Sequence, residues 1–325
     1  MNFAVVGTNF ITDWMIEAGK LCPDFSLVAV YSRTMERALE YAGLHGAKYA
    51  FDKLSDICDC DEVDAVYVAS PTSFHGAQSI LFMNAGKHVL CEKPIASNSP
   101  ELEKMLQCAS KNNVVLVEAM RPQFSPVMKC IENMLTSLGK IRHANINFCQ
   151  YSSRYDRYLA GEDVNAFNPK LSNGALMDLG CYCVHVMVRL FGLSESIQSS
   201  KVLLSNGCDA AGVILAEYAD KTVVLNYSKI SDTQGFSEIQ GEKGSLQFRL
   251  PSNLKEVYLT KRGSKTERII TGAVEKDMLY ELQAFIDFTK NPEGMSVYHG
   301  YSLDALKIMD EARRQCGIVF EADLL

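Results

Sequence analysis

The stretch His88-Val89-Leu90-Cys91-Glu92-Lys93-Pro94 places a carboxylate, an ammonium and a proline directly after a short apolar run. The apolar run predicts a buried strand, and in an open α/β sheet ligands bind at the carboxyl ends of the strands. Proline biases the residue before it toward an extended backbone, so the direction of Lys93 is set in advance. We expect a functional lysine at a sheet edge, with a solvated loop lysine as the alternative.

Apolar runs alternate with amphipathic helical patterns on both sides of this stretch. We expect strands at 3–6, 27–31, 65–69, 88–91 and 114–118, and helices at 11–19, 34–43, 74–84 and 99–112. Thr34 is the expected N-cap of the second helix, and Ser97 or Ser99 that of the last. This alternation predicts a doubly wound parallel sheet covered on both faces, in a domain spanning residues 1–121.

The first strand-to-helix turn reads Gly7-Thr8-Asn9-Phe10-Ile11-Thr12. A dinucleotide-binding turn reads Gly-x-Gly-x-x-Gly/Ala, because glycines let the pyrophosphate approach the helix N-terminus. Asn9 replaces the second glycine, and asparagine tolerates left-handed backbone; Thr12 replaces the third. An ordinary tight turn is the alternative. Because the turn opens the first βαβ unit, we expect residues 7–11 to contact a cofactor.

The second strand ends without an acidic residue, in Tyr31-Ser32-Arg33-Thr34, and Arg37 follows one helical turn later. An acid at this place binds a ribose 2′-hydroxyl and disfavours a 2′-phosphate. Arginine pairs with phosphate oxygens through its planar fork. We expect Ser32, Arg33 and Arg37 to favour NADP over NAD, the alternative being two solvated arginines.

Ser70, Pro71 and Thr72 follow the third predicted strand, at the sheet edge where we expect the cofactor. His75 falls in the first turn of the next helix. It either contacts the cofactor or simply packs.

The pattern changes after Arg121. We expect a helix at 122–138 and a strand at 141–150, then an irregular segment at 151–170 that is rich in aromatic and charged residues and ends in Asn168-Pro169. Loops of this length in compact domains are usually functional, although a mobile surface loop is the alternative. We expect the segment to shape substrate specificity and Asn168 to bind substrate.

A helical pattern runs from Asn173 to Phe191 and carries Asp178, Tyr182 and His185 at i, i+4 and i+7. This spacing places the three polar groups on one face of an otherwise apolar helix. Burying them without a purpose is costly, so we expect a site here; one buried Asp–Tyr hydrogen bond in the core is the alternative.

The remaining sequence predicts an α+β domain, residues 122–325, built on a large, mainly antiparallel open sheet. The expected strands are 197–204, 211–218, 222–229, 238–241, 245–249 and 257–260, followed by helices at 275–290 and 301–316. One face of such a sheet stays free after helices cover the other, which predicts a homodimer or larger assembly through this sheet.

Composition excludes several classes of protein. The chain has 325 residues, a formal charge of −7, 47% apolar and 22% charged residues, which argues against nucleic-acid partners. No apolar run approaches the ~18 residues of a membrane span, and the N-terminus lacks the basic start of a signal peptide. Eleven irregularly spaced cysteines indicate a reducing, cytoplasmic compartment. Neither close pair (Cys58/Cys60, Cys181/Cys183) has a partner pair at zinc-finger spacing, so no metal site is expected.

Together, the N-terminal βαβ unit, Glu92-Lys93-Pro94, Glu118-Ala119-Met120-Arg121, Asn173-Gly174-Ala175 and Asp178-Leu179-Gly180-Cys181-Tyr182 resemble the glucose–fructose oxidoreductase/inositol dehydrogenase (Gfo/Idh/MocA) family. The resemblance covers almost the whole chain and is greatest to the branch of dimeric dihydrodiol dehydrogenase and NADP-dependent D-xylose dehydrogenase. It implies a Rossmann-type first domain and a cofactor contact by Glu92, Lys93 and Arg121.

The resemblance also implies catalytic roles for Lys93, Tyr182 and Asp178, with Lys93, Tyr182 and His185 contacting substrate. Tyr182 stands where other branches carry a histidine acid/base, which argues against inositol as substrate. The implied reaction is hydride transfer between nicotinamide and a carbinol carbon of a sugar, polyol or dihydrodiol. A phenol of pKa ~10 is a poor base at neutral pH, and a nearby ammonium favours the phenolate. The alternative, a sugar- or nucleotide-sensing regulatory protein on the same scaffold, would not need the lysine.

Overall fold

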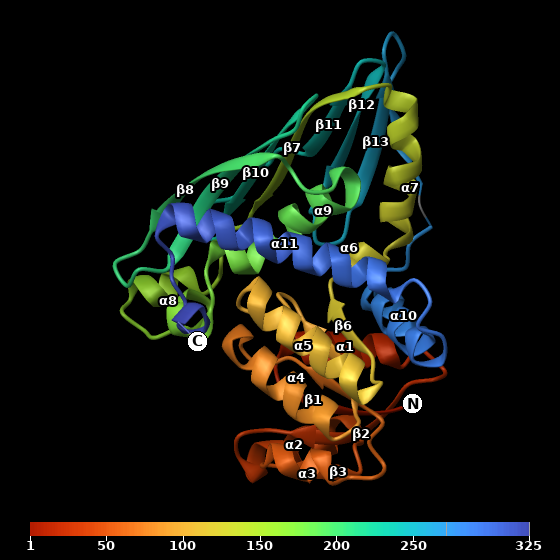
Figure 1. Cartoon of the computed structure of the whole chain (residues 1–325), viewed down its shortest axis with the longest axis vertical. Coiled ribbons are helices and arrows are strands. Elements are labelled where there is room, and N and C mark those ends of the chain that lie inside the picture. The colour runs from red at the N-terminus through yellow and green to blue at the C-terminus, as the bar shows by residue number, and fades with distance from the viewer. Residues whose placement is uncertain (271, 325) are drawn as a thin grey trace. The chain divides into compact units, whose positions relative to one another are not determined.

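The computed structural model describes residues 1–270 and 272–324, which form two compact units (Figure 1). Unit 1 consists of Met1–Met120 and Val274–Gly300, and unit 2 of Arg121–Ala273 and Tyr301–Leu325. The sequence predicts a single boundary after residue 121. The first crossing lies there, but the chain later returns to unit 1, so the second predicted domain includes a segment that the structure assigns to the first.

Unit 1 is built on a six-stranded, entirely parallel sheet with the order β3-β2-β1-β4-β5-β6. The strands are β1 (Asn2–Val6), β2 (Ser26–Tyr31), β3 (Tyr49–Phe51), β4 (Ala65–Val68), β5 (His88–Glu92) and β6 (Leu116–Ala119). The chain starts in the middle of the sheet and winds outward in both directions. This is the doubly wound order of dinucleotide-binding domains, and it confirms the predicted fold class.

Five helices connect these strands: α1 (Phe10–Gly19), α2 (Met35–His45), α3 (Leu54–Cys58), α4 (His75–Asn84) and α5 (Ser99–Asn112). Thr34 caps α2 as predicted, accepting from the Arg37 N–H. The prediction of Ser97 or Ser99 as the cap of α5 is wrong. Asn98 takes that role, because its side chain accepts from the Glu101 N–H at 2.9 Å.

The segment that returns to unit 1 carries α10 (Met278–Lys290). The ring of Phe285 lies 5.7 Å from the ring of Phe3 in β1, and the Cys22 thiol donates to Gln283 Oε1 at 3.3 Å. Phe285 is completely buried. Local sequence patterns identify this helix but not the unit against which it packs, because its apolar partner lies in the first strand of the chain.

Unit 2 contains an eight-stranded sheet with the order β14-β13-β12-β11-β7-β10-β9-β8. Only the β7–β10 pair is parallel, so the predicted mainly antiparallel sheet is confirmed. The strands are β7 (Ile141–Cys149), β8 (Ser196–Leu203), β9 (Asp209–Glu217), β10 (Thr222–Ser228), β11 (Ser237–Gly241), β12 (Gly244–Arg249), β13 (Lys255–Lys261) and β14 (Glu267–Ile269).

The helices of unit 2 include α6 (Arg121–Phe124), α7 (Pro126–Leu135), α8 (Tyr155–Leu159), α9 (Cys181–Phe191) and α11 (Met295–Cys316), whose first residues belong to unit 1. Figure 1 shows α7, α9 and α11 on one side of the large sheet. A π-helical turn, Leu176–Gly180, precedes α9. The single helix predicted at 122–138 is divided at Ser125, which caps α7.

The segment predicted to be irregular, 151–170, contains α8 and the short 3-10 helices Asn165–Phe167 and Pro169–Leu171. Next to it, Pro169–Phe191 is long and apolar enough to cross a membrane, with a mean hydropathy of 1.3, and 72% of its most apolar window is buried in the fold. The sequence reading misses this stretch because charged residues interrupt it. A core helix passes the same test of length and composition, and this one carries the residues of the predicted site.

Candidate active site

The first turn of unit 1 needs a glycine at position 7. Gly7 has φ +112°, and a Cβ atom there would lie 2.6 Å from the carbonyl oxygen of Ala69, at the end of β4. Most side chains are strained in this backbone region. The ends of β1 and β4 therefore lie too close together for any side chain at position 7. Without a side chain, the turn also leaves room for a cofactor to approach its backbone. This geometry fits the pyrophosphate of a dinucleotide.

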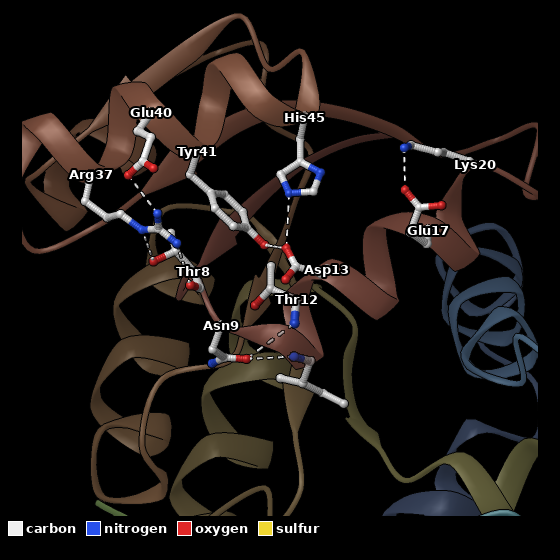
Figure 2. Close-up of polar contacts among 11 residues, drawn as sticks. Thr8, Asn9, Thr12, Asp13, Glu17, Lys20, Arg37, Glu40, Tyr41 and His45 are labelled. Atoms are coloured by element: carbon white, nitrogen blue, oxygen red, sulfur yellow. Dashed lines mark hydrogen bonds and ion pairs between the residues drawn. The ribbon is translucent and has the colours of Figure 1, made fainter.

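Asn9 caps α1, and its backbone is extended, with φ −114° and ψ 175°. Its Oδ1 accepts from the N–H groups of Ile11 at 2.9 Å and Thr12 at 3.4 Å (Figure 2). Its Nδ2 donates to the Ala69 carbonyl at 3.0 Å. Asn9 therefore does not use the left-handed conformation that asparagine tolerates. Capping determines the conformation, because the first N–H groups of a helix need acceptors.

Arg37 lies over the same turn, from the first half of α2 (Figure 2). Its Nε donates to Thr8 Oγ1 and its Nη2 to the Thr8 carbonyl, both at 3.3 Å, and its Nη1 pairs with Glu40 at 2.7 Å. Ser32 and the exposed Arg33 follow the end of β2, the neighbouring strand. The structure thus brings Arg37 to the predicted cofactor turn and leaves the Arg33 side chain open to solvent.

His75 packs between two loops of unit 1. Its Nδ1 lies 2.9 Å from the Pro94 carbonyl and its Nε2 2.8 Å from the Ser70 carbonyl, and only 1% of the residue is exposed. Burial lowers the pKa of His75. Both ring nitrogens are occupied by backbone, so the structure supports packing rather than the predicted cofactor contact. His75 instead ties the segment after β4, where Ser70, Pro71 and Thr72 lie, to the segment after β5.

Two buried carboxylates hold the backbone on either side of Lys93. Glu92 accepts from the Tyr67 hydroxyl and, at 3.2 Å, from the Lys93 N–H. Glu118, from the adjacent strand β6, accepts from the Ile95 N–H at 3.0 Å. The Lys93–Pro94 peptide is cis. The two carboxylate hydrogen bonds fix the backbone on either side of Lys93 at the carboxyl edge of β5, and this role of Glu118 was not predicted.

In unit 2, Asp178 lies on the π-helical turn and Tyr182 in the first turn of α9. Tyr182 is buried, and its ring lies 5.7 Å from the Phe148 ring of β7. Asp178 Oδ2 lies 2.8 Å from the ammonium of Lys229, directly after β10. The Asp178 side chain is 38% exposed, in contrast to that of Lys229 at 3%.

His185 and Asn168, both predicted to bind substrate, have partners elsewhere in unit 2. The Nδ1 of His185 lies 3.3 Å from Gln123 Nε2, and Gln123 also donates to the His185 carbonyl. Asn168 Oδ1 accepts from the Lys170 N–H at 3.0 Å, which caps a short 3-10 helix. His185 therefore faces α6, while Asp178 faces the end of β10. The three polar residues predicted to share one helix face, Asp178, Tyr182 and His185, thus contact different parts of unit 2.

Lys229 and Asp209 were not predicted as site residues. Asp209 is buried, and its Oδ2 accepts from the Leu176 N–H at 2.7 Å, where the π-helical turn begins. Burial raises the pKa of Asp209, while that N–H and Lys229 oppose the rise. One signal is present in the sequence: Lys229 directly follows a strand, as Lys93 does, although the predicted strand 222–229 includes it as the last residue.

Comparison with known proteins identifies both halves of the chain. Residues 1–120 match the oxidoreductase family with an NAD-binding Rossmann fold, and residues 136–247 match the GFO/IDH/MocA C-terminal domain. A scyllo-inositol 2-dehydrogenase (NADP(+)), IolU of Bacillus subtilis, is 43% identical over 325 residues, which cover 99% of each chain. A trans-1,2-dihydrobenzene-1,2-diol dehydrogenase of Danio rerio is 28% identical, over 94% of this chain and 97% of its own.

The fold has solved counterparts. KijD10, a 3-ketoreductase from Actinomadura kijaniata in complex with NADP and TDP-benzene, superposes with a TM-score of 0.86 at 20% identity, over 98% of this chain and 99% of its own. The family model of residues 1–120, an NAD-binding Rossmann fold, agrees with the doubly wound parallel sheet of unit 1. The chain belongs to the Gfo/Idh/MocA family of nicotinamide-dinucleotide oxidoreductases.

Proposed function

We propose that the chain interconverts a secondary alcohol of a polyol or sugar and the corresponding ketone, with NADP as its preferred cofactor. The observation that carries the proposal is the backbone around Lys93 at the carboxyl edge of the parallel sheet: buried Glu92 accepts from the Lys93 N–H and buried Glu118 from the Ile95 N–H. A lysine that only needed solvent would not require two buried carboxylates to fix the segment that carries it.

A polyol such as an inositol is the first substrate class to test. The resemblance implies, from the tyrosine at position 182 in place of a histidine, that inositol is not the substrate, but the relative at 43% identity is named for scyllo-inositol. That argument therefore does not exclude inositols. A spectrophotometric screen of inositols, aldoses and dihydrodiols with NADP and NAD tests the proposal, and absence of turnover with all of them would contradict it.

The side chains divide the work of removing a hydroxyl proton. The bound dinucleotide supplies the hydride chemistry. The phenolic oxygen of Tyr182 takes the proton from the substrate hydroxyl, and the role proposed for the Lys93 ammonium is to stabilise negative charge on the developing alkoxide. Asp178 orients the group that handles the proton. The Tyr182 ring is held against Phe148, so its hydroxyl is aimed by packing.

Exchanging Arg33 for aspartate is expected to weaken NADP binding far more than NAD binding, by roughly 100-fold. Hydrogen bonds to a charged group contribute about 1.5–3 kcal/mol each, and an aspartate would also repel the 2′-phosphate. Titration of each reduced cofactor against the fluorescence of Trp14, the single tryptophan, measures both affinities. Arg33→Ala separates loss of the cation from the added repulsion. Equal weakening of both cofactors would remove Arg33 from the 2′-phosphate site.

We propose that a second copy of the chain covers the partly buried face of the large sheet. Along β9 and β10 this face alternates with the fully buried one and carries Val213, Leu215 and Val224. It also carries a closed amide cluster, in which Asn226 Nδ2 donates to Asn145 at 2.8 Å and to Asn147 at 2.9 Å. Burying these amides under a second copy costs less free energy than burying unpaired amides, because their hydrogen bonds to each other remain when water is removed.

Sedimentation at micromolar concentration is expected to give at least twice the chain mass of 36.1 kDa. Leu215→Arg is expected to shift the protein toward monomer, because it places a charge on the apolar part of the face. A wild-type monomer would contradict the proposal.

We further propose a cytoplasmic location, because all eleven cysteines are free.

A further inference from the structure

Lys229 is a buried cation that lies between the catalytic helix and the segment proposed to shape specificity. It follows β10 directly, and its side chain is 3% exposed. Its Nζ lies 2.8 Å from Asp178 Oδ2, donates to the Ala166 carbonyl at 2.6 Å and lies 4.8 Å from the centre of the Phe167 ring. A buried ammonium is retained only where its donors are satisfied. Here the partners come from two different parts of unit 2.

Three consecutive carbonyls of the segment accept side-chain donors from three different places. Asn173 Nδ2 donates to the Asn165 carbonyl at 2.8 Å, and Asn206 Nδ2 donates to the Phe167 carbonyl at 2.6 Å. Lys229 donates to the carbonyl between them. Phe167 is buried among the aromatic rings of Tyr155 and Tyr158. The segment is therefore held as one piece, and Lys229 supplies its only charged anchor among these three donors.

Lys229 also contacts the π-helical turn that precedes α9, and the backbone of this turn is itself held in place. The carboxylate of Asp209 holds the start of the π-helical turn, and a Cβ on Gly174 would lie 1.8 Å from Asp209 Oδ1. Lys229 favours the ionised form of that carboxylate. Asp178 leaves the same turn and reaches back to Lys229. One ammonium thus pairs with the Asp178 carboxylate of the turn and bonds to the backbone of the specificity segment.

We propose that Lys229 is a positioning residue that fixes the Asp178 carboxylate and residues 164–168 in a single arrangement, so that substrate fit and catalytic geometry are set together. The inference rests on the proposed function. Lys229 is too deeply buried to act on substrate directly, and it works through Asp178 on one side and through Ala166 on the other. A polyol bound against the segment would then meet Asp178 at a fixed distance.

Lys229→Met removes the charge and retains most of the side-chain volume. We expect kcat with the best polyol to fall by up to about 100-fold, since small misplacements near a reacting group have effects of this size, and KM to rise. Lys229→Arg should recover part of the loss. In the Asp178→Asn background, Lys229→Met should add little to the loss of kcat. Full additivity of the two changes would overturn the action through Asp178.

Lys221 offers a matched control at the other end of β10. It pairs with Asp220 at 2.6 Å and lies 4.9 Å from the Tyr218 ring, the same two kinds of contact. Lys221→Met should leave kcat and KM unchanged. Thermal melting of all variants identifies any that fail to fold, and Lys229→Arg then carries the test.

Hydrogen exchange gives a readout that needs no turnover. In Lys229→Met, amides of 164–168 should exchange at least about 10-fold faster than in wild type and in Lys221→Met, because opening of the segment becomes easier. Unchanged exchange there would overturn the proposal even if the enzyme is active. If no substrate is turned over by wild type but exchange accelerates as expected, the proposed function fails while the anchoring role stands.

Discussion

Replacing Lys93 with methionine is expected to abolish measurable turnover and to leave dinucleotide binding largely intact. The ammonium stabilises charge that develops during the reaction, and donors of this kind contribute about 10²–10³-fold each. The loss in kcat should therefore reach about 10³-fold. Steady-state rates and Trp14 fluorescence titration with the reduced cofactor measure the two effects separately.

The structure supplies a control for this experiment in the lysine at the other end of β5. Lys87 precedes the strand and donates to the Cys60 carbonyl at 2.8 Å. Lys87→Met should change stability more than rate, because that bond joins two loops away from the carboxyl edge of the sheet. Near-normal turnover by Lys93→Met, at normal cofactor affinity, would remove the lysine from the mechanism.

The alternation of strands and helices in unit 1 was predictable because its longer strands are mostly apolar and several of its helices carry local start or stop signals. Buried parallel strands have this pattern, and residues such as Thr34 mark helix starts locally. The short strand β3 and helix α3 were not predicted, since Tyr49–Phe51 and Leu54–Cys58 are only three and five residues long. The return of α10 to unit 1 was equally hidden, because its partner Phe3 is distant in sequence.

Site residues whose role depends on their position in a turn or at a strand end could be predicted from the sequence. Site residues whose role depends on contacts with distant parts of the chain could not. Gly7 and Lys93 are fixed by the turn and the sheet edge that contain them. At position 9 the motif expects a glycine, whereas this chain has an asparagine that caps α1. Comparison with the motif alone does not reveal that cap. The Asp178–Lys229 pair joins residues 51 positions apart (229 minus 178), so no local pattern contains it.

Tyr182→Phe is expected to lower kcat by about 10²–10⁴-fold, the usual contribution of a general acid–base group. The substitution removes one oxygen and keeps the ring against Phe148 at 5.7 Å, so packing is retained. Substrate affinity should change little. In wild type, the rate of alcohol oxidation should rise with pH as the phenol ionises, and the variant should lose that rise. Rate profiles from neutral to alkaline pH, measured with saturating cofactor, test both expectations.

His185 is the rival acid–base residue, and its contacts argue against it. Its ring is 1% exposed, its Nδ1 lies 3.3 Å from Gln123, and Gln123 Oε1 accepts from Arg189. A histidine in such a chain of contacts fixes α9 against α6, so His185→Ala should lower stability more than rate. Asp178→Asn should reduce kcat less than Tyr182→Phe, because the aspartate orients and does not transfer the proton. If Tyr182→Phe keeps its activity and pH profile while His185→Ala is inactive but folded, the proton passes through the histidine.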